Sequence, residues 1–168
     1  RYIIEQVISS ELGYQNTAYS SLDFVSLIER KNKFQIMKKF AVVLSGSGVF
    51  DGSEIHEATL SLLAISQAGA SYEVFAPDIA QHHVINHLTG EEMSETRNVL
   101  VESARIARGK IKPLSDFEAE NYDCLLFPGG FGAAKNLSSF AFDGAECLIN
   151  KEVEKAVKTM FDAKKPIG

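Results

Sequence analysis

Three kinds of residue in this sequence could take part in chemistry: a carboxylate, a pair of glycines and two cysteines. Glu57 lies in the first turn of a predicted helix, where the helix dipole favours a negative charge. Gly129 and Gly130 follow an apolar run and Pro128, so their N–H groups could stabilise an oxyanion. Together with a nucleophile, such groups would support addition and proton transfer. Each has a structural alternative: an exposed helix acid for Glu57 and a simple turn for the glycines.

Neither cysteine has the surroundings of a nucleophile. Cys124 lies inside an apolar run, where we expect it to pack as a small hydrophobic residue. Cys147 follows the loop-like Asp143-Gly144 and has no base beside it in the sequence. The two cysteines also lack the spacing of a zinc site and do not form a disulfide framework.

Three histidines follow the second predicted strand, at positions 82, 83 and 87. Their spacing does not give a closed ligand set, and acidic or thiolate partners are missing nearby. We therefore predict loop residues and no metal site.

Glycines after the first predicted strand suggest a second possibility, nucleotide binding. Gly46, Gly48 and Gly52 lie between a strand and a helix, and Asp78 follows the second strand, where a ribose-binding acid would be. The spacing is one residue longer than the dinucleotide fingerprint. A tight turn that needs positive φ explains the same glycines.

The elements that must position these residues alternate between strands and helices. Apolar runs predict strands at Phe40–Leu44, Tyr72–Ala76 and Cys124–Phe127, and helical periodicity predicts helices at 55–68, 94–109 and 153–161. Asp51 and Glu54 have the form of a capping box, and Glu102, Arg105 and Arg108 indicate a solvated helical face. This alternation predicts a doubly wound α/β fold with a parallel sheet, whose ligand site lies beyond the carboxyl ends of the strands.

The first 36 residues differ from the rest. Met37 is followed at once by the first predicted strand, so we expect a domain at 37–168 and an extension at 1–36 that contains two short helices or has little order.

Composition narrows the function classes. A net charge of −5 removes the main driving force for nucleic-acid binding. The sequence has no apolar run long enough to span a membrane and no secretory signal pattern, so we predict a soluble cytoplasmic protein that binds neither nucleic acid nor membrane.

Four motifs, in order, resemble the enhancing-lycopene-biosynthesis type glyoxalases of the ThiJ/PfpI superfamily. They are LSGSGVFDGSEIHE from Leu44 to Glu57, VINHLTG from Val84, ETRNV from Glu95 and FPGGFGAAKNL from Phe127 to Leu137. The resemblance extends from Met37 to Gly168.

This resemblance implies a three-layer α/β/α, flavodoxin-like sandwich with a mostly parallel sheet, of the class I glutamine amidotransferase-like kind, truncated at its C-terminus. It implies a homodimeric lyase that converts glyoxal to glycolate without a cofactor or metal and is linked to isoprenoid biosynthesis. Glu57 would transfer the proton, and Gly129 and Gly130 would hold the oxyanion. The nucleophilic cysteine is expected beyond Gly168, so we expect the chain as given to be inactive and to leave a sheet edge exposed. Two alternatives to the enzyme stay open, a nucleotide-binding protein and a non-catalytic interaction module of the same fold.

Overall fold

Four parallel strands form one sheet in the computed structural model, which describes residues 37–168. Their order is β3-β2-β1-β4. The strands are β1 (Lys39–Val43), β2 (Ser71–Ala76), β3 (Ile111–Pro113) and β4 (Cys124–Leu126). In the register of the sheet, Val42 of β1 pairs with Val74 of β2 on one side and with Leu126 of β4 on the other. The prediction of two short helices before Met37 lies outside the described residues.

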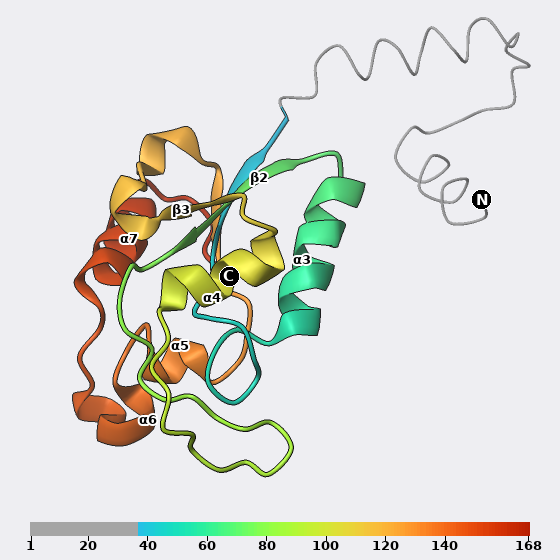
Figure 1. Ribbon diagram of the computed structural model, residues 1–168. Helices are drawn as coiled ribbons and strands as arrows, with labels where there is room; N and C mark the ends of the chain where they lie inside the picture. The colour runs from blue at the N-terminus through green and yellow to red at the C-terminus, as the bar shows by residue number, and fades with distance from the viewer. Residues whose placement is uncertain (1–36) are drawn as a thin grey trace, which may run out of the picture. The chain divides into compact units, whose positions relative to one another are not determined.

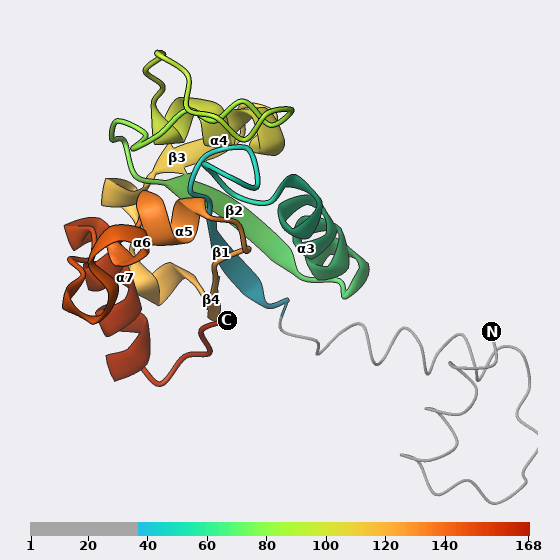
Figure 2. The ribbon, with the colours of Figure 1, turned by 90° about the horizontal axis from the view of Figure 1, so that it is seen from below.

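Helices cover both faces of the sheet, as Figures 1 and 2 show. One face carries α3 (Ile55–Gln67) and α4 (Val99–Ala107), and their apolar side chains pack on Val42, Leu44 and Val74. The other face carries α7 (Lys151–Asp162), whose Val153, Ala156 and Met160 pack in the second core cluster. The short helices α5 (Gly132–Lys135) and α6 (Phe140–Asp143) follow β4. The predicted three-layer α/β/α fold is confirmed.

The sheet is buried because its strands alternate between two apolar faces. Val42 and Leu44 point to the α3 and α4 side, whereas Ala41 and Val43 join the cluster under α7. In that second cluster, the ring of Phe75 packs edge-on against two other aromatic rings, Phe117 and Tyr122, at centroid distances of 5.8 and 5.6 Å. Such pairs stabilise a core beyond the area that they bury.

Two elements, the strand β3 and the helix α4, differ from what the sequence predicted. The strand β3 was not predicted, because three residues that include Lys112 and Pro113 give no apolar run. Helix α4 begins at Val99 rather than at Ser94, because the Asn98 side chain caps it by accepting the Val101 N–H at 3.0 Å.

A third correction concerns the charges of α4. Glu102 was predicted on a solvated face, but it is only 5% exposed. Its carboxylate pairs with Arg105 at 2.9 Å and with Arg97 at 3.5 Å. The pairing makes burial of the charge possible, since both arginines remain partly in solvent.

Because all strands are parallel, β1, β2 and β4 end at the same edge of the sheet. The turn after β1, the long connection Pro77–Asn98 and the turn after β4 therefore leave the sheet together. Three short 3-10 helices complete the described chain. The first two, η1 (Leu114–Asp116) and η2 (Ala119–Asn121), precede β4, and the third, η3 (Gly144–Glu146), follows α6. None of the described helices has the length and apolar character to cross a membrane.

Candidate functional site

The glycine-rich turn after β1 folds back on itself. Ser45 donates its N–H to Ser53 Oγ at 2.9 Å, and the two buried hydroxyl groups lie 3.1 Å apart. Gly48 donates its N–H to the Ser53 carbonyl at 2.9 Å, and Gly46 donates to Ser103 Oγ of α4 at 2.9 Å. The turn is therefore held by its own bonds and by α4.

These bonds argue against the nucleotide-binding alternative. A phosphate cradle needs backbone N–H groups that are free to donate, and the amides just described already have protein acceptors. Phe50 also donates its N–H, to His87 Nε2 at 3.3 Å. Asp78, the candidate ribose-binding acid, accepts from Asn98 Nδ2 at 2.8 Å at the start of α4.

Glu54 fixes the start of α3 and thereby the position of Glu57. Glu54 is the N-cap residue of the helix, and its Oε2 accepts the Glu57 N–H at 2.7 Å. The predicted capping box with Asp51 is wrong. Asp51 is buried and accepts the Ile85 N–H at 2.7 Å, so it holds the long connection instead of the helix.

Glu57 and Gly129 are direct neighbours, although 72 positions separate them in the sequence. The carboxylate of Glu57 lies against Gly129 Cα, because a Cβ at position 129 would overlap Glu57 Oε2. Glu54 donates its backbone N–H to the Gly129 carbonyl at 2.7 Å. Gly130 packs on the backbone of Gly52 and Glu54 with φ of +111°, a conformation that favours glycine. The sequence-predicted residues thus lie together at the carboxyl edge.

The backbone N–H groups of Gly129 and Gly130 are a second feature of this edge. Within Met37–Gly168, the N–H groups of Gly129 and Gly130 donate to no protein acceptor. Both residues are half-buried rather than fully exposed. A carboxylate and two N–H groups without a protein acceptor in Met37–Gly168 can hold a proton and stabilise a negative charge at one edge of the sheet. We call Glu57, Gly129 and Gly130 the Glu57 site.

The last residues of the chain run beside β4 in the parallel direction. Leu125 donates its N–H to the Pro166 carbonyl at 3.0 Å, Gly168 donates to the Leu125 carbonyl at 3.0 Å, and Phe127 donates to the Gly168 carbonyl at 2.9 Å. At Gly168 the backbone therefore points toward the edge where Phe127 leaves the sheet, which is the edge of the Glu57 site.

Asn136 supports this edge, and no signal in the sequence singled it out. It is 7% exposed, and its Nδ2 donates to the Ser45 and Asp51 carbonyls at 2.8 and 2.9 Å. Its Oδ1 accepts the His82 N–H at 2.9 Å. One amide side chain thus joins the turn after β1, the connection after β2 and the segment after β4.

Neither cysteine lies in the turns that contribute to the Glu57 site. Cys124 is in β4 and partly buried, and burial raises the pKa of its thiol, as suits a packed rather than a reactive cysteine. Cys147 follows η3.

The histidines serve as packing groups. His82 stacks on Phe142 at a centroid distance of 4.1 Å, and burial lowers its pKa. The His87 ring packs against the Phe50 ring at a centroid distance of 4.9 Å, with the two planes tilted by 32°. Over the described residues, no cluster of His, Cys, Asp and Glu has the arrangement of a metal site.

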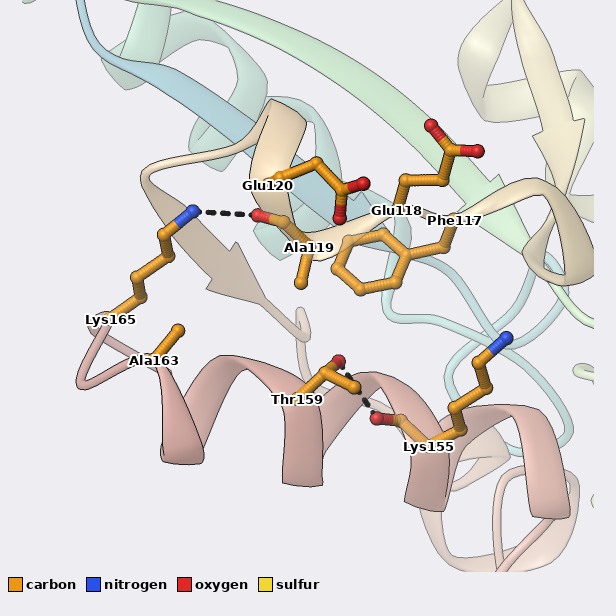
Figure 3. Close-up of a pocket in the computed structure, with 8 residues that line it drawn as sticks. All are labelled: Phe117, Glu118, Ala119, Glu120, Lys155, Thr159, Ala163 and Lys165. Carbon is orange, nitrogen blue, oxygen red and sulfur yellow. Dashed lines mark hydrogen bonds between the residues drawn. The ribbon is translucent and has the colours of Figure 1, made fainter.

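A separate groove of about 450 Å³ lies between α7 and the segment before β4 (Figure 3). Lys165 crosses one end, where its Nζ donates to the Ala119 and Tyr122 carbonyls at 2.7 and 2.6 Å. The groove also contains Glu118, Glu120 and Lys155 but none of the residues of the Glu57 site.

Comparison with known proteins supports the fold. The chain is 59% identical over 131 residues to ES1 protein homolog, mitochondrial, of Rattus norvegicus, and 57% identical over 131 residues to glutamine amidotransferase-like class 1 domain-containing protein 3, mitochondrial, of Homo sapiens. It is 44% identical, with a TM-score of 0.74, to the crystal structure of an isoprenoid biosynthesis protein with amidotransferase-like domain from Ehrlichia chaffeensis. The chain has an amidotransferase-like α/β fold.

The matches cover different shares of the chains compared. They include 77% of this chain, but 49% of the rat and human relatives and 61% of the Ehrlichia structure. The chain thus spans about half the length of the curated relatives it matches. No protein-family model matches it.

The names of the relatives contradict the cytoplasmic prediction. The rat, human and Danio rerio relatives, the last 41% identical, are all named mitochondrial. The prediction rested on the lack of a secretory signal and of a membrane-spanning run, and neither feature bears on import into mitochondria.

Proposed function

We propose that this chain supplies the proton-transfer and oxyanion-binding half of a glyoxalase-like enzyme that converts glyoxal to glycolate. The observation that carries the proposal is the contact between the Glu57 carboxylate and Gly129, next to two backbone amides that have no acceptor within the described residues 37–168. The resemblance of four sequence motifs to glyoxalases of the ThiJ/PfpI superfamily supports the choice of reaction.

The nucleophile in this proposal is a cysteine that follows Gly168. Since residues 166–168 run parallel to β4, a continuing backbone would leave the sheet next to Phe127 and face the Glu57 site. Cys124 is less suitable, because it lies in β4 itself and burial raises the pKa of its thiol.

The proposed reaction adds one water to glyoxal overall. The cysteine thiolate adds to one aldehyde carbon, and the resulting alkoxide is stabilised by the N–H groups of Gly129 and Gly130 before it is protonated. Glu57 then removes the hydrogen from this carbon as a proton and delivers a proton to the neighbouring carbon, so that a glycolyl thioester forms. Hydrolysis of the thioester releases glycolate and regenerates the thiol. No external oxidant or cofactor is needed, since one carbon is oxidised while the other is reduced.

The test uses the full-length protein that contains this chain, with glyoxal as substrate and glycolate as the measured product. We expect turnover in the natural protein and a loss of at least ~100-fold in Glu57→Gln, because the amide cannot transfer the proton. The matched control is Glu120→Gln, an exposed acid of the separate groove, which should keep full activity. Glycolate formation by the 168-residue chain alone would refute a nucleophile beyond Gly168, and full activity of Glu57→Gln would refute the role of Glu57.

The proposal also includes the cellular compartment, the oligomeric state and a link to isoprenoid biosynthesis. The curated relatives are named mitochondrial, and we propose the same compartment for the protein that contains this chain. Protection from added protease by isolated mitochondria would support this location. We also propose a homodimer and a link to isoprenoid biosynthesis. The dimer rests on the family resemblance, and the link rests on that resemblance and on the description of the Ehrlichia structure.

A further inference from the structure

Glu54 makes contacts on both sides of the Glu57 site. Its backbone N–H donates to the Gly129 carbonyl at 2.7 Å, and its Oε2 accepts the Glu57 N–H at 2.7 Å. Its other carboxylate oxygen lies 2.9 Å from His56 Nδ1. We propose that Glu54 is a positioning residue that sets the proton-transfer group and the oxyanion-binding amides in one geometry; this inference rests on the function proposed above.

The backbone bond of Glu54 orients a peptide group of the site. In a trans peptide the C=O and the following N–H point in opposite directions. The Gly129 carbonyl points at Glu54 N, so the Gly130 N–H points away from the start of α3. That N–H is one of the two amides of the Glu57 site, and neither has a protein acceptor within residues 37–168. The direction of an oxyanion donor therefore depends on where Glu54 lies.

The side chain of Glu54 fixes its own backbone and that of Glu57. Glu54 has an extended backbone, with φ of −65° and ψ of 121°, whereas Glu57 lies in the first helical turn. The carboxylate bridges these two conformations through the Glu57 N–H. That bond, followed by the His56 side chain, keeps the pKa of Glu54 below its usual value, so the carboxylate is charged at neutral pH. A charged acceptor makes the stronger hydrogen bond to the N–H.

The packing around Gly129 and Gly130 is too tight for the first turn of α3 to move without breaking these contacts. The Glu57 carboxylate lies directly on Gly129 Cα, and Gly130 is packed on the backbone of Glu54 and Gly52. A shift of the first turn of α3 would therefore separate the carboxylate from the amides. Displacements of about 1 Å can reduce a catalytic rate by ~100-fold.

An ordinary helix cap would stabilise α3 without any effect on catalysis, and α7 offers a matched control for that case. Asn150 caps α7 by accepting the Glu152 and Val153 N–H groups at 2.9 and 3.2 Å, and it touches no residue of the Glu57 site through these bonds. Loss of either cap is expected to lower the melting temperature by about 2–4 °C.

The experiment compares Glu54→Ala, Glu54→Gln and Asn150→Ala in the full-length protein with glyoxal as substrate. We expect Glu54→Ala to lower kcat about 10- to 100-fold with less than about a threefold change in KM, because the amides and the carboxylate are misplaced relative to each other. Glu54→Gln should recover most of kcat, since its amide oxygen can still accept the Glu57 N–H and its NH₂ can donate to His56. Asn150→Ala should lower the melting temperature equally but leave kcat unchanged. Equal kcat in Glu54→Ala and Asn150→Ala would overturn the inference.

A second measurement separates this inference from the proposed reaction. If the natural protein does not turn over glyoxal, the proposed function fails, but the positioning role is still tested by the backbone amide resonances of Gly129 and Gly130. We expect Glu54→Ala to shift both resonances, Glu54→Gln to shift them less, and Asn150→Ala to leave them in place. Unchanged resonances in Glu54→Ala would refute the positioning role whatever the activity.

Discussion

The hydrogen atoms of Gly129 decide whether Glu57 can occupy its place. A methyl group at position 129 would overlap Glu57 Oε2, and the neighbour that must move is the end of a flexible, exposed side chain. Gly129, unlike Gly130, does not have a positive φ, so alanine fits the backbone there. We therefore expect Gly129→Ala to fold normally, with a melting temperature within about 2 °C of the natural protein, and to lose ~100-fold in glyoxal turnover.

Gly130→Ala is the matched variant with the opposite expectation. Its φ is +111°, and a Cβ would meet the backbone of Gly52 and Glu54, which cannot rotate away. The strain of such a conformation costs about 1–3 kcal/mol, so the thermal midpoint should fall by several degrees. The measurement is the melting temperature of each variant, compared with that of the natural protein. If Gly129→Ala were the less stable of the two, the packing described for the Glu57 site would be incorrect.

At the scale of elements, Asn136 is the side chain on which the edge of the sheet depends. It is buried and donates to two carbonyls and accepts one N–H, all from other loops. Asn136→Ala leaves these buried groups without partners, and we expect a loss of about 3 kcal/mol. Urea unfolding should show a lower midpoint with an unchanged slope. The control is Asn121→Ala. Asn121 is exposed and its Nδ2 donates to Glu118, so the loss of stability should stay within about 0.5 kcal/mol.

Sequence patterns predicted the elements that have a strong local signal. The strands β1, β2 and β4 are apolar runs that end at glycine or proline turns, and α3 has a regular apolar period, so their existence and type were clear. Pairing with β2 rather than composition makes β3 a strand, since it has three residues and ends in proline. Boundaries that depend on a side-chain cap, such as the start of α4 at Asn98, also need the structure.

The site was predictable in part for the same reason. Parallel strands bring their carboxyl ends together, so the turns that contain Glu57 and Gly129 were expected at one edge. The direct contact of these residues depends on side-chain packing, which has no sequence period. Asp51 was assigned to a helix cap because its spacing to Glu54 fits, but the connection after β2 supplies a better donor, the Ile85 N–H. Tertiary hydrogen bonds of this kind compete with local ones and are not visible in the sequence.

At the scale of the whole molecule, one carboxylate connects the strands. Glu73 of β2 accepts the Tyr122 hydroxyl and pairs with Lys39 of β1 and Lys112 of β3, each at 2.9 Å. These contacts, the Tyr122 hydroxyl first, lower the pKa of Glu73 from 4.5 to about 2. Burial of the Tyr122 hydroxyl, together with the same bond, raises the pKa of Tyr122. Three neighbouring strands and the segment before β4 therefore share one negative charge.

This charge makes the stability of the sheet depend on acid pH. The pKa of Glu73 is lower in the folded than in the unfolded state, so its contribution is fully present above about pH 4.5 and is lost as the pH falls from there toward 2. We expect the urea midpoint of the natural protein to fall between pH 5 and pH 3, and we expect Glu73→Gln to be less stable at pH 7 and to show a flatter decline. The control is Glu154→Gln, which breaks an exposed pair with Lys158 on α7 and should leave the slope unchanged, since solvent screens such pairs. If Glu73→Gln declined as steeply as the natural protein, carboxylates other than Glu73 would control its acid stability.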